Sequence, residues 1–75
     1  MSIPLSNLAT GGSGVVTTIG AAGSFRHRLL DLGIVPGTTI RRLLSSPTGD
    51  PVCFLVRGAQ IALRRADAAQ IQVLV

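Results

Sequence analysis

The sequence predicts a mainly β fold, a small barrel of about five strands with one short inserted helix. Short runs of apolar and β-branched residues fill most of the chain, and glycine or proline separates them. Only residues 24–33 show the apolar spacing of a helix, and that stretch ends on a glycine. At 75 residues, the chain is expected to form one domain over residues 1–75.

The N-terminal part predicts an edge segment, a turn and a strand. Residues 3–8 include Pro4, which cannot donate to a strand ladder and therefore suits a sheet edge. The run 10–14 is rich in glycine and predicts a turn. It lacks the Lys-Ser/Thr ending of a phosphate-binding loop, so a nucleotide site is not expected there. A β-branched strand is predicted at 15–19 and a second turn at 20–23.

The inserted helix is predicted from its apolar stripe and its end signals. Phe25, Leu29 and Leu32 recur at helical spacing and should face the core. Ser24 is expected to cap the N-terminus, and Gly33 to end the helix in the left-handed conformation.

Leu30 lies off this stripe, between Arg26 and His27 on the helical wheel. A single exposed leucine is ordinary on a protein surface, and contact with a partner is the alternative interpretation.

The C-terminal part predicts four strands, at 38–44, 51–57, 60–64 and 71–75, with a turn at 45–50 and one helical turn at 65–69. Residues 57–60 predict a tight hairpin turn of type II′, with Gly58 at its first central position. Alternation along these strands assigns the following residues to the core: Val52, Phe54, Val56, Ile61, Leu63, Ile71, Val73 and Val75.

The same alternation directs Cys53, Leu55 and Leu74 outward. With 47% hydrophobic residues, the chain has more apolar side chains than one small core hides, which indicates a partner surface or a homo-oligomer. Five short strands and one inserted helix favour an SH3-like barrel.

Composition narrows the functional classes. Seven arginines and no lysine oppose three aspartates, giving a net charge of +4. This balance suits nucleic acid, an anionic membrane or an acidic protein, but a solvated basic surface explains it equally well. Cys53 is the single cysteine, so neither an internal disulfide nor a cysteine-cluster zinc site is expected. Without an apolar run near 20 residues or a signal-peptide pattern, the expected location is cytoplasmic.

In the order of its motifs the chain resembles the ferrous iron transport protein A (FeoA) family over nearly its whole length. The resemblance is carried by an ordered series of blocks, namely Leu5-Ser6-Asn7-Leu8, Arg28-Leu29, Leu32-Gly33-Ile34, Pro36-Gly37, Pro47, Gly49-Asp50-Pro51, Gly58, Ile61-Ala62-Leu63-Arg64, Ala68 and 71–73. Arg42 is a departure, because the family more often has an apolar strand residue there.

The resemblance implies a cytosolic accessory of the FeoB ferrous iron transporter that docks on the transporter's cytoplasmic G-protein region. It implies no cofactor and no chemistry of the chain's own. The same barrel also occurs as a C-terminal module of iron-dependent repressors, so a regulatory module of such a system is one alternative. A small basic barrel that binds nucleic acid is another, although Phe25 and Phe54 are both assigned to the core.

The candidate partner-binding residues are Arg26, Arg28, Leu30, Cys53 and Leu55. His27 and Asp31 lie one helical turn apart and, with Cys53, form the only conceivable metal set, which is too small for a stable site. A single histidine and three scattered carboxylates also offer no acid–base pair, so the chain is not expected to be an enzyme.

Overall fold

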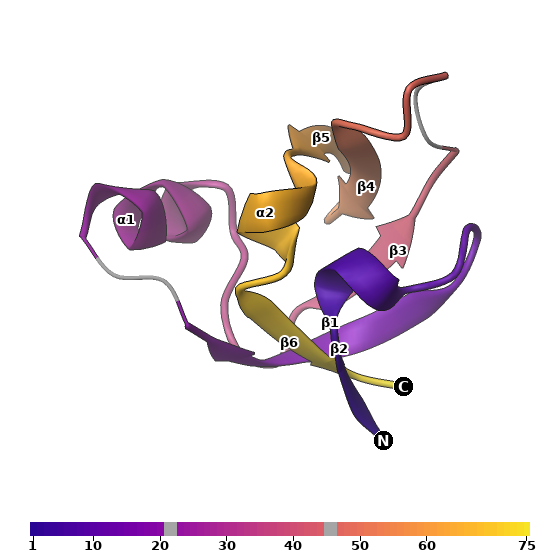
Figure 1. The fold of residues 1–75 in the computed structure, drawn as a ribbon. Helices are drawn as coiled ribbons and strands as arrows, with labels where there is room; N and C mark the ends of the chain where they lie inside the picture. Colours follow the sequence, from indigo (N-terminus) through magenta and orange to yellow (C-terminus); the bar gives the residue numbers. More distant parts are fainter. Residues whose placement is uncertain (21–22, 45–46) are drawn as a thin grey trace.

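The computed structural model describes residues 1–20, 23–44 and 47–75. In these residues six strands form one antiparallel sheet in the order β1-β6-β2-β3-β4-β5 (Figure 1). The strands are β1 Ser2–Pro4, β2 Ser13–Ile19, β3 Thr39–Arg42, β4 Val52–Val56, β5 Ala59–Leu63 and β6 Ile71–Leu74. The helices are α1 Ser24–Asp31 and α2 Arg65–Ala68, and Leu5–Asn7 forms a 3₁₀ turn, η1. The predicted mainly β architecture with an inserted helix is confirmed.

Strand β2 is the centre about which the sheet curls. Its residue Val15 pairs with Thr39 of β3 on one side and with Leu74 of β6 on the other. The register between β2 and β6 shifts between Val16 and Thr18, an irregularity of the kind that increases local twist. The β4–β5 hairpin therefore lies across from β6, and α2 and η1 lie between the two ends of the sheet (Figure 1).

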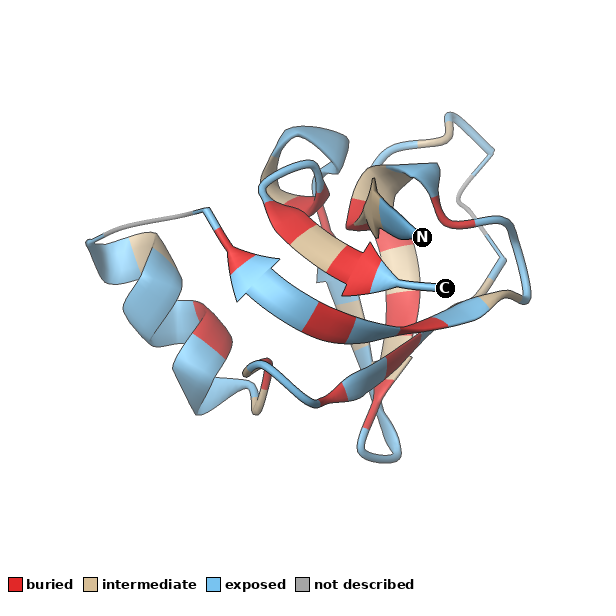
Figure 2. Ribbon diagram, turned by 90° about the horizontal axis from the view of Figure 1, so that it is seen from below, coloured by how far each residue is buried: buried red, intermediate tan, exposed pale blue. Residues whose placement is uncertain are grey.

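The core lies inside this curl. Its buried side chains are Leu5, Leu8, Val16, Ile19, Leu29, Ile34, Ile40, Val52, Phe54, Val56, Leu63, Ala68, Ile71 and Val73. Figure 2 shows the resulting alternation of buried and exposed positions along the strands. The predicted core positions on β4 are confirmed, and Ile61 is half-buried against the cluster.

Two details of the C-terminal part correct the expectations. Val75 is about half exposed rather than in the core, because β6 ends at Leu74 and Val75 bonds to the backbone of Met1. The β4–β5 turn has Arg57 and Gly58 as its central residues, both with positive φ. It is therefore a type I′ turn, whose twist matches that of the flanking strands, and not type II′.

The turn predicted at 10–14 is shorter than expected, because β2 already begins at Ser13. Residues 21–22 and 45–46, parts of the turns predicted at 20–23 and 45–50, lie outside the described residues. The predicted edge segment 3–8 divides into the end of β1 and η1, and η1 buries Leu5 and leads to buried Leu8.

Candidate protein-interaction surface

Helix α1 begins at Ser24, the residue that was predicted to be its N-cap. Gly23 occupies the N-cap position with φ 70°, a conformation that favours glycine, and Ser24 is the first helical residue. Among the described residues no side chain caps this end. The predicted capping role of Ser24 is therefore wrong.

The C-terminal end of α1 is closed by the backbone. Gly33 adopts φ 84°, as predicted for a left-handed cap. The Gly33 N–H donates to the Leu30 carbonyl and the Ile34 N–H to the Leu29 carbonyl, each with an N to O distance of 2.9 Å. These two hydrogen bonds form a Schellman motif. Leu29 and Ile34 are both fully buried, as the apolar contact that usually accompanies this motif requires.

A buried hydroxyl then fixes the helix exit to the sheet. Thr38 is 5% exposed; its Oγ1 donates to the Gly33 carbonyl at 3.1 Å and accepts from the Val35 N–H at 3.3 Å. The Thr38 N–H also donates to the Val35 carbonyl. Helix α1 is thus anchored where it meets β3, while its body projects to one side of the sheet (Figure 1).

The faces of α1 follow the predicted phase except at its end. Leu29 is buried and Phe25 is half-buried against the core. Leu30 is 41% exposed, as expected for a residue off the stripe. Leu32, predicted to be on the buried stripe, is 37% exposed because the chain leaves the helix there and Ile34 occupies the core instead.

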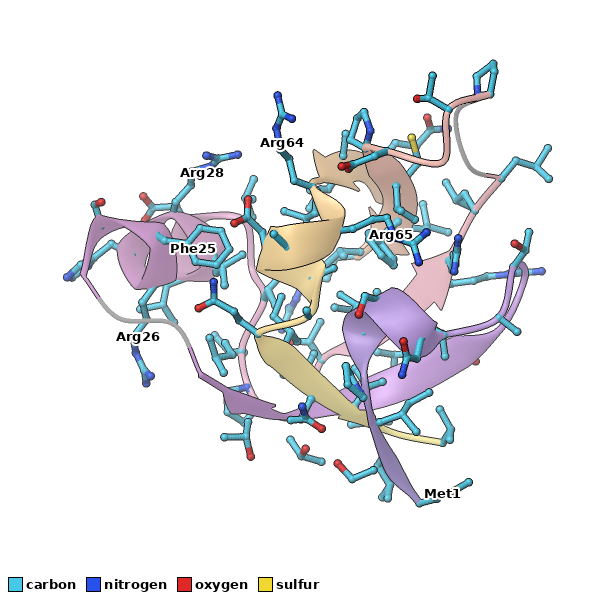
Figure 3. The ribbon with its side chains drawn as sticks, viewed as in Figure 1. Met1, Phe25, Arg26, Arg28, Arg64 and Arg65 are labelled. Carbon is cyan, nitrogen blue, oxygen red and sulfur yellow. The ribbon has the colours of Figure 1, made fainter. Side chains whose placement is uncertain are left out.

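The solvent-exposed positions of α1 carry basic side chains and one large apolar side chain. Arg26, His27 and Arg28 are all exposed, as is Leu30. Figure 3 shows Arg26 and Arg28 extending away from the helix in different directions. We call Arg26, Arg28 and Leu30 the α1 surface.

The other two candidate residues lie on a different element. Cys53 and Leu55 are on the outer face of β4, as alternation predicted, but both are half-buried. Leu55 lies between Arg41 of β3 and Gln60 of β5, and these long side chains flank it. The five candidate residues therefore form two groups, one on α1 and one on β4.

His27 and Asp31 lie on α1, whereas Cys53 lies on β4. In the part of the chain that the structure describes, no three His, Cys, Asp or Glu residues gather closely enough to hold a metal ion. The described residues also contain no helix with the length and hydropathy of a membrane span.

Leu74 is exposed as alternation predicted, and the structure adds residues outside the candidate set. Val15 and Leu74 pair across β2 and β6 and are both exposed, but the unbroken β-branched run of β2 concealed which side Val15 faces. Arg42, the departure from the family pattern, is half-buried. Its Nη1 donates to the Leu8 carbonyl at 2.7 Å and so ties the segment after η1 to β3.

Comparison with known proteins gives a consistent result. The family model described as the FeoA domain matches residues 3–75. The chain is 41% identical over 69 residues to an Fe(2+) transport protein A/Fe(2+) transporter FeoB fusion protein of Porphyromonas gingivalis. That match covers 92% of this chain but only 8% of the fusion protein.

Solved structures agree in fold. The FeoA protein of Chlorobium tepidum is 36% identical with a TM-score of 0.91, over 97% of this chain and 70% of that one. Stenotrophomonas maltophilia FeoA, solved with zinc and described as an SH3 domain protein, is 29% identical with a TM-score of 0.82, over 99% and 89% of the two chains. The predicted SH3-like fold is thereby confirmed. T. acidophilum IdeR is 24% identical with a TM-score of 0.86, over 99% of this chain and 34% of that one, and this likeness is one of fold alone.

Proposed function

The chain belongs to the FeoA domain family, a family of ferrous iron transport, and we propose that it is an accessory protein that docks on the cytoplasmic G-protein region of a FeoB-type transporter. The observation that carries this proposal is the Porphyromonas gingivalis relative, in which a segment similar to this chain is fused to a FeoB transporter. Fusion keeps two modules at high effective concentration, which favours a contact between them. The chain would then be cytoplasmic and reach the membrane only through its partner.

We assign the contact to the α1 surface. Leu30 offers an exposed apolar anchor, and Arg26, one helical turn before it on the same side of α1, adds positive charge beside it, whereas Arg28 extends in another direction (Figure 3). Interfaces commonly gain energy from a buried centre and orientation from a polar rim. Because the Gly33 cap and Thr38 already fix the end of α1, little ordering entropy is lost on binding. The matching surface is an apolar pocket bordered by acidic residues.

The outer face of β4 is the second choice for this contact. Cys53 and Leu55 are apolar, but both are half-buried in the free protein. Each of them therefore exposes less side chain than Leu30 does, and each alone has less hydrophobic free energy to contribute.

Titration calorimetry of the folded protein against the soluble G-protein region of a cognate FeoB tests the function. The region is used nucleotide-free, with GDP and with a non-hydrolysable GTP analogue, and an unrelated small G protein of similar net charge serves as the control. We expect saturable binding in at least one nucleotide state and none to the control. Absence of binding in all three states contradicts the proposal.

A further inference from the structure

The two edges of the sheet are protected very differently. Strand β1 forms one edge with only three residues, one of them Pro4. Strand β5 forms the other edge with five residues, Ala59–Leu63, none of which is charged or a proline. Natural edge strands are usually shortened, charged, bulged or interrupted by proline, because an open edge pairs with other chains. The edge at β5 has none of these protections.

The register shows which backbone groups this edge offers. In a two-residue hairpin, the pair next to the turn, here Val56 and Ala59, is hydrogen-bonded, and bonded pairs then alternate along the ladder. The N–H and C=O groups of Gln60 and Ala62 therefore point away from β4. Both residues are exposed, and within the described residues no other segment bonds to their backbones. Their groups repeat about 7 Å apart, which is the spacing a further strand presents.

The charges at the two ends of β5 indicate what this edge fits. Arg57 precedes the strand and Arg64 and Arg65 follow it, and all three are exposed. A Cβ on Gly33 would lie 3.2 Å from the Cδ of Arg57, so the Arg57 side chain lies along the end of α1. Two carboxylates lie near the other end: Asp50, whose Oδ1 accepts from the Arg65 N–H at 3.1 Å, and half-buried Asp67 in the first turn of α2. The edge is thus an uncharged strand with exposed arginine side chains at each end.

This charge pattern argues against a second copy and for a different partner. Two β5 strands paired antiparallel about Ile61 would bring Arg57 of each copy opposite Arg65 of the other, with Arg64 next to it. Like charges placed opposite each other destabilise strand pairs. An extended segment with acidic residues on both sides of about five uncharged residues would instead meet opposite charge at each end.

We propose that the free edge of β5 binds an extended, acid-flanked peptide segment of a partner protein by strand addition. The main chain of the peptide bonds to Gln60 and Ala62, and its terminal acids face Arg57 and Arg64. Strand addition is a common mode of peptide recognition, with main-chain bonds supplying affinity and side chains supplying selectivity. The proposal stands independently of the α1 contact.

The test is an NMR titration of the whole chain with the peptide Asp-Val-Thr-Val-Thr-Val-Asp. We expect the largest amide shifts at Gln60 and Ala62, together with slower hydrogen exchange of both amides. A peptide with lysine in place of both aspartates should bind about tenfold more weakly, because two attractive charge contacts become repulsive. Shifts centred on α1, equal affinity for the two peptides, or no binding at millimolar peptide overturns the proposal.

Variants of the chain supply the matched controls. Ala62→Pro removes an outward N–H without removing a ladder bond and should abolish peptide binding while circular dichroism stays unchanged. The double variant Arg57→Glu, Arg64→Glu contains no added proline, so its result does not depend on whether Ala62→Pro folds. It should reverse the preference of the chain toward the lysine peptide. Leu30→Glu should bind the aspartate peptide as the natural chain does. An unchanged preference in the double variant, peptide loss in Leu30→Glu, or a dimer in sedimentation that Ala62→Pro disrupts contradicts the proposed occupant.

Discussion

The two helices are both short, yet they are held in different ways. Helix α2 lies between the ends of the sheet, with Ala68 fully buried and its first N–H bonded to Asp50 from a distant loop. Helix α1 is twice as long but buries only Leu29 completely, and it is fixed mainly where it meets β3. Helices of this length do not persist alone in water, so tertiary contacts decide whether each forms. The difference indicates that α2 completes the core, whereas α1 is anchored at one end and leaves its surface available.

The largest expected effect distinguishes the anchoring side of α1 from its free side. Leu29→Ala should lower the free energy of unfolding by about 2–5 kcal/mol, because a fully buried leucine is truncated. Leu30→Ala, on the exposed side, should change it by less than about 0.5 kcal/mol. Urea denaturation measures both. Equal losses in the two variants would show that the two faces of α1 are not different in burial.

The next effect tests whether α2 is packed into the core. Ala68→Leu should cost about 1–3 kcal/mol, since a larger side chain is forced into a fully buried position. Ala69→Leu is the matched control at the neighbouring exposed position and should leave stability nearly unchanged. Thermal unfolding of the two variants provides the measurement. A melting temperature of Ala68→Leu equal to that of the natural chain would refute the comparison.

A smaller effect concerns the cap that anchors α1. Gly33→Ala places a Cβ on a residue with φ 84° and beside the Cδ of Arg57, and it should cost about 1–2 kcal/mol. Gly33→Asn should cost less, because asparagine tolerates the left-handed conformation better. Denaturant midpoints provide the measurement. A neutral Gly33→Ala variant would mean that this cap does not hold the helix.

Local rules predicted the parts of the fold that depend on neighbouring residues in sequence. Alternation identified Val52, Phe54 and Val56 because β4 is buried on one face only. Gly33 was predicted as the cap because few other residues adopt its backbone conformation at low cost. The exposure of Leu30 followed from the helical phase.

What the sequence did not reveal depends on contacts between distant segments. Leu5 and Leu8 become buried because η1 packs against α2, and nothing local announces that contact. Leu55 points outward as predicted, but its exposure is set by cross-strand neighbours that only the register identifies. The turn at Arg57 was misassigned because a non-glycine residue adopts positive φ there.

The most direct test of the α1 assignment is the affinity of Leu30→Glu, with Arg26 left intact, for the soluble G-protein region of a cognate FeoB. Leu44→Glu is the matched control, because Leu44 is 80% exposed and lies outside α1. We expect Leu30→Glu to remain folded by circular dichroism and to bind about tenfold more weakly, as for loss of an interface anchor, while Leu44→Glu binds normally. Unchanged affinity of a folded Leu30→Glu variant would contradict the assignment and direct attention to Cys53 and Leu55.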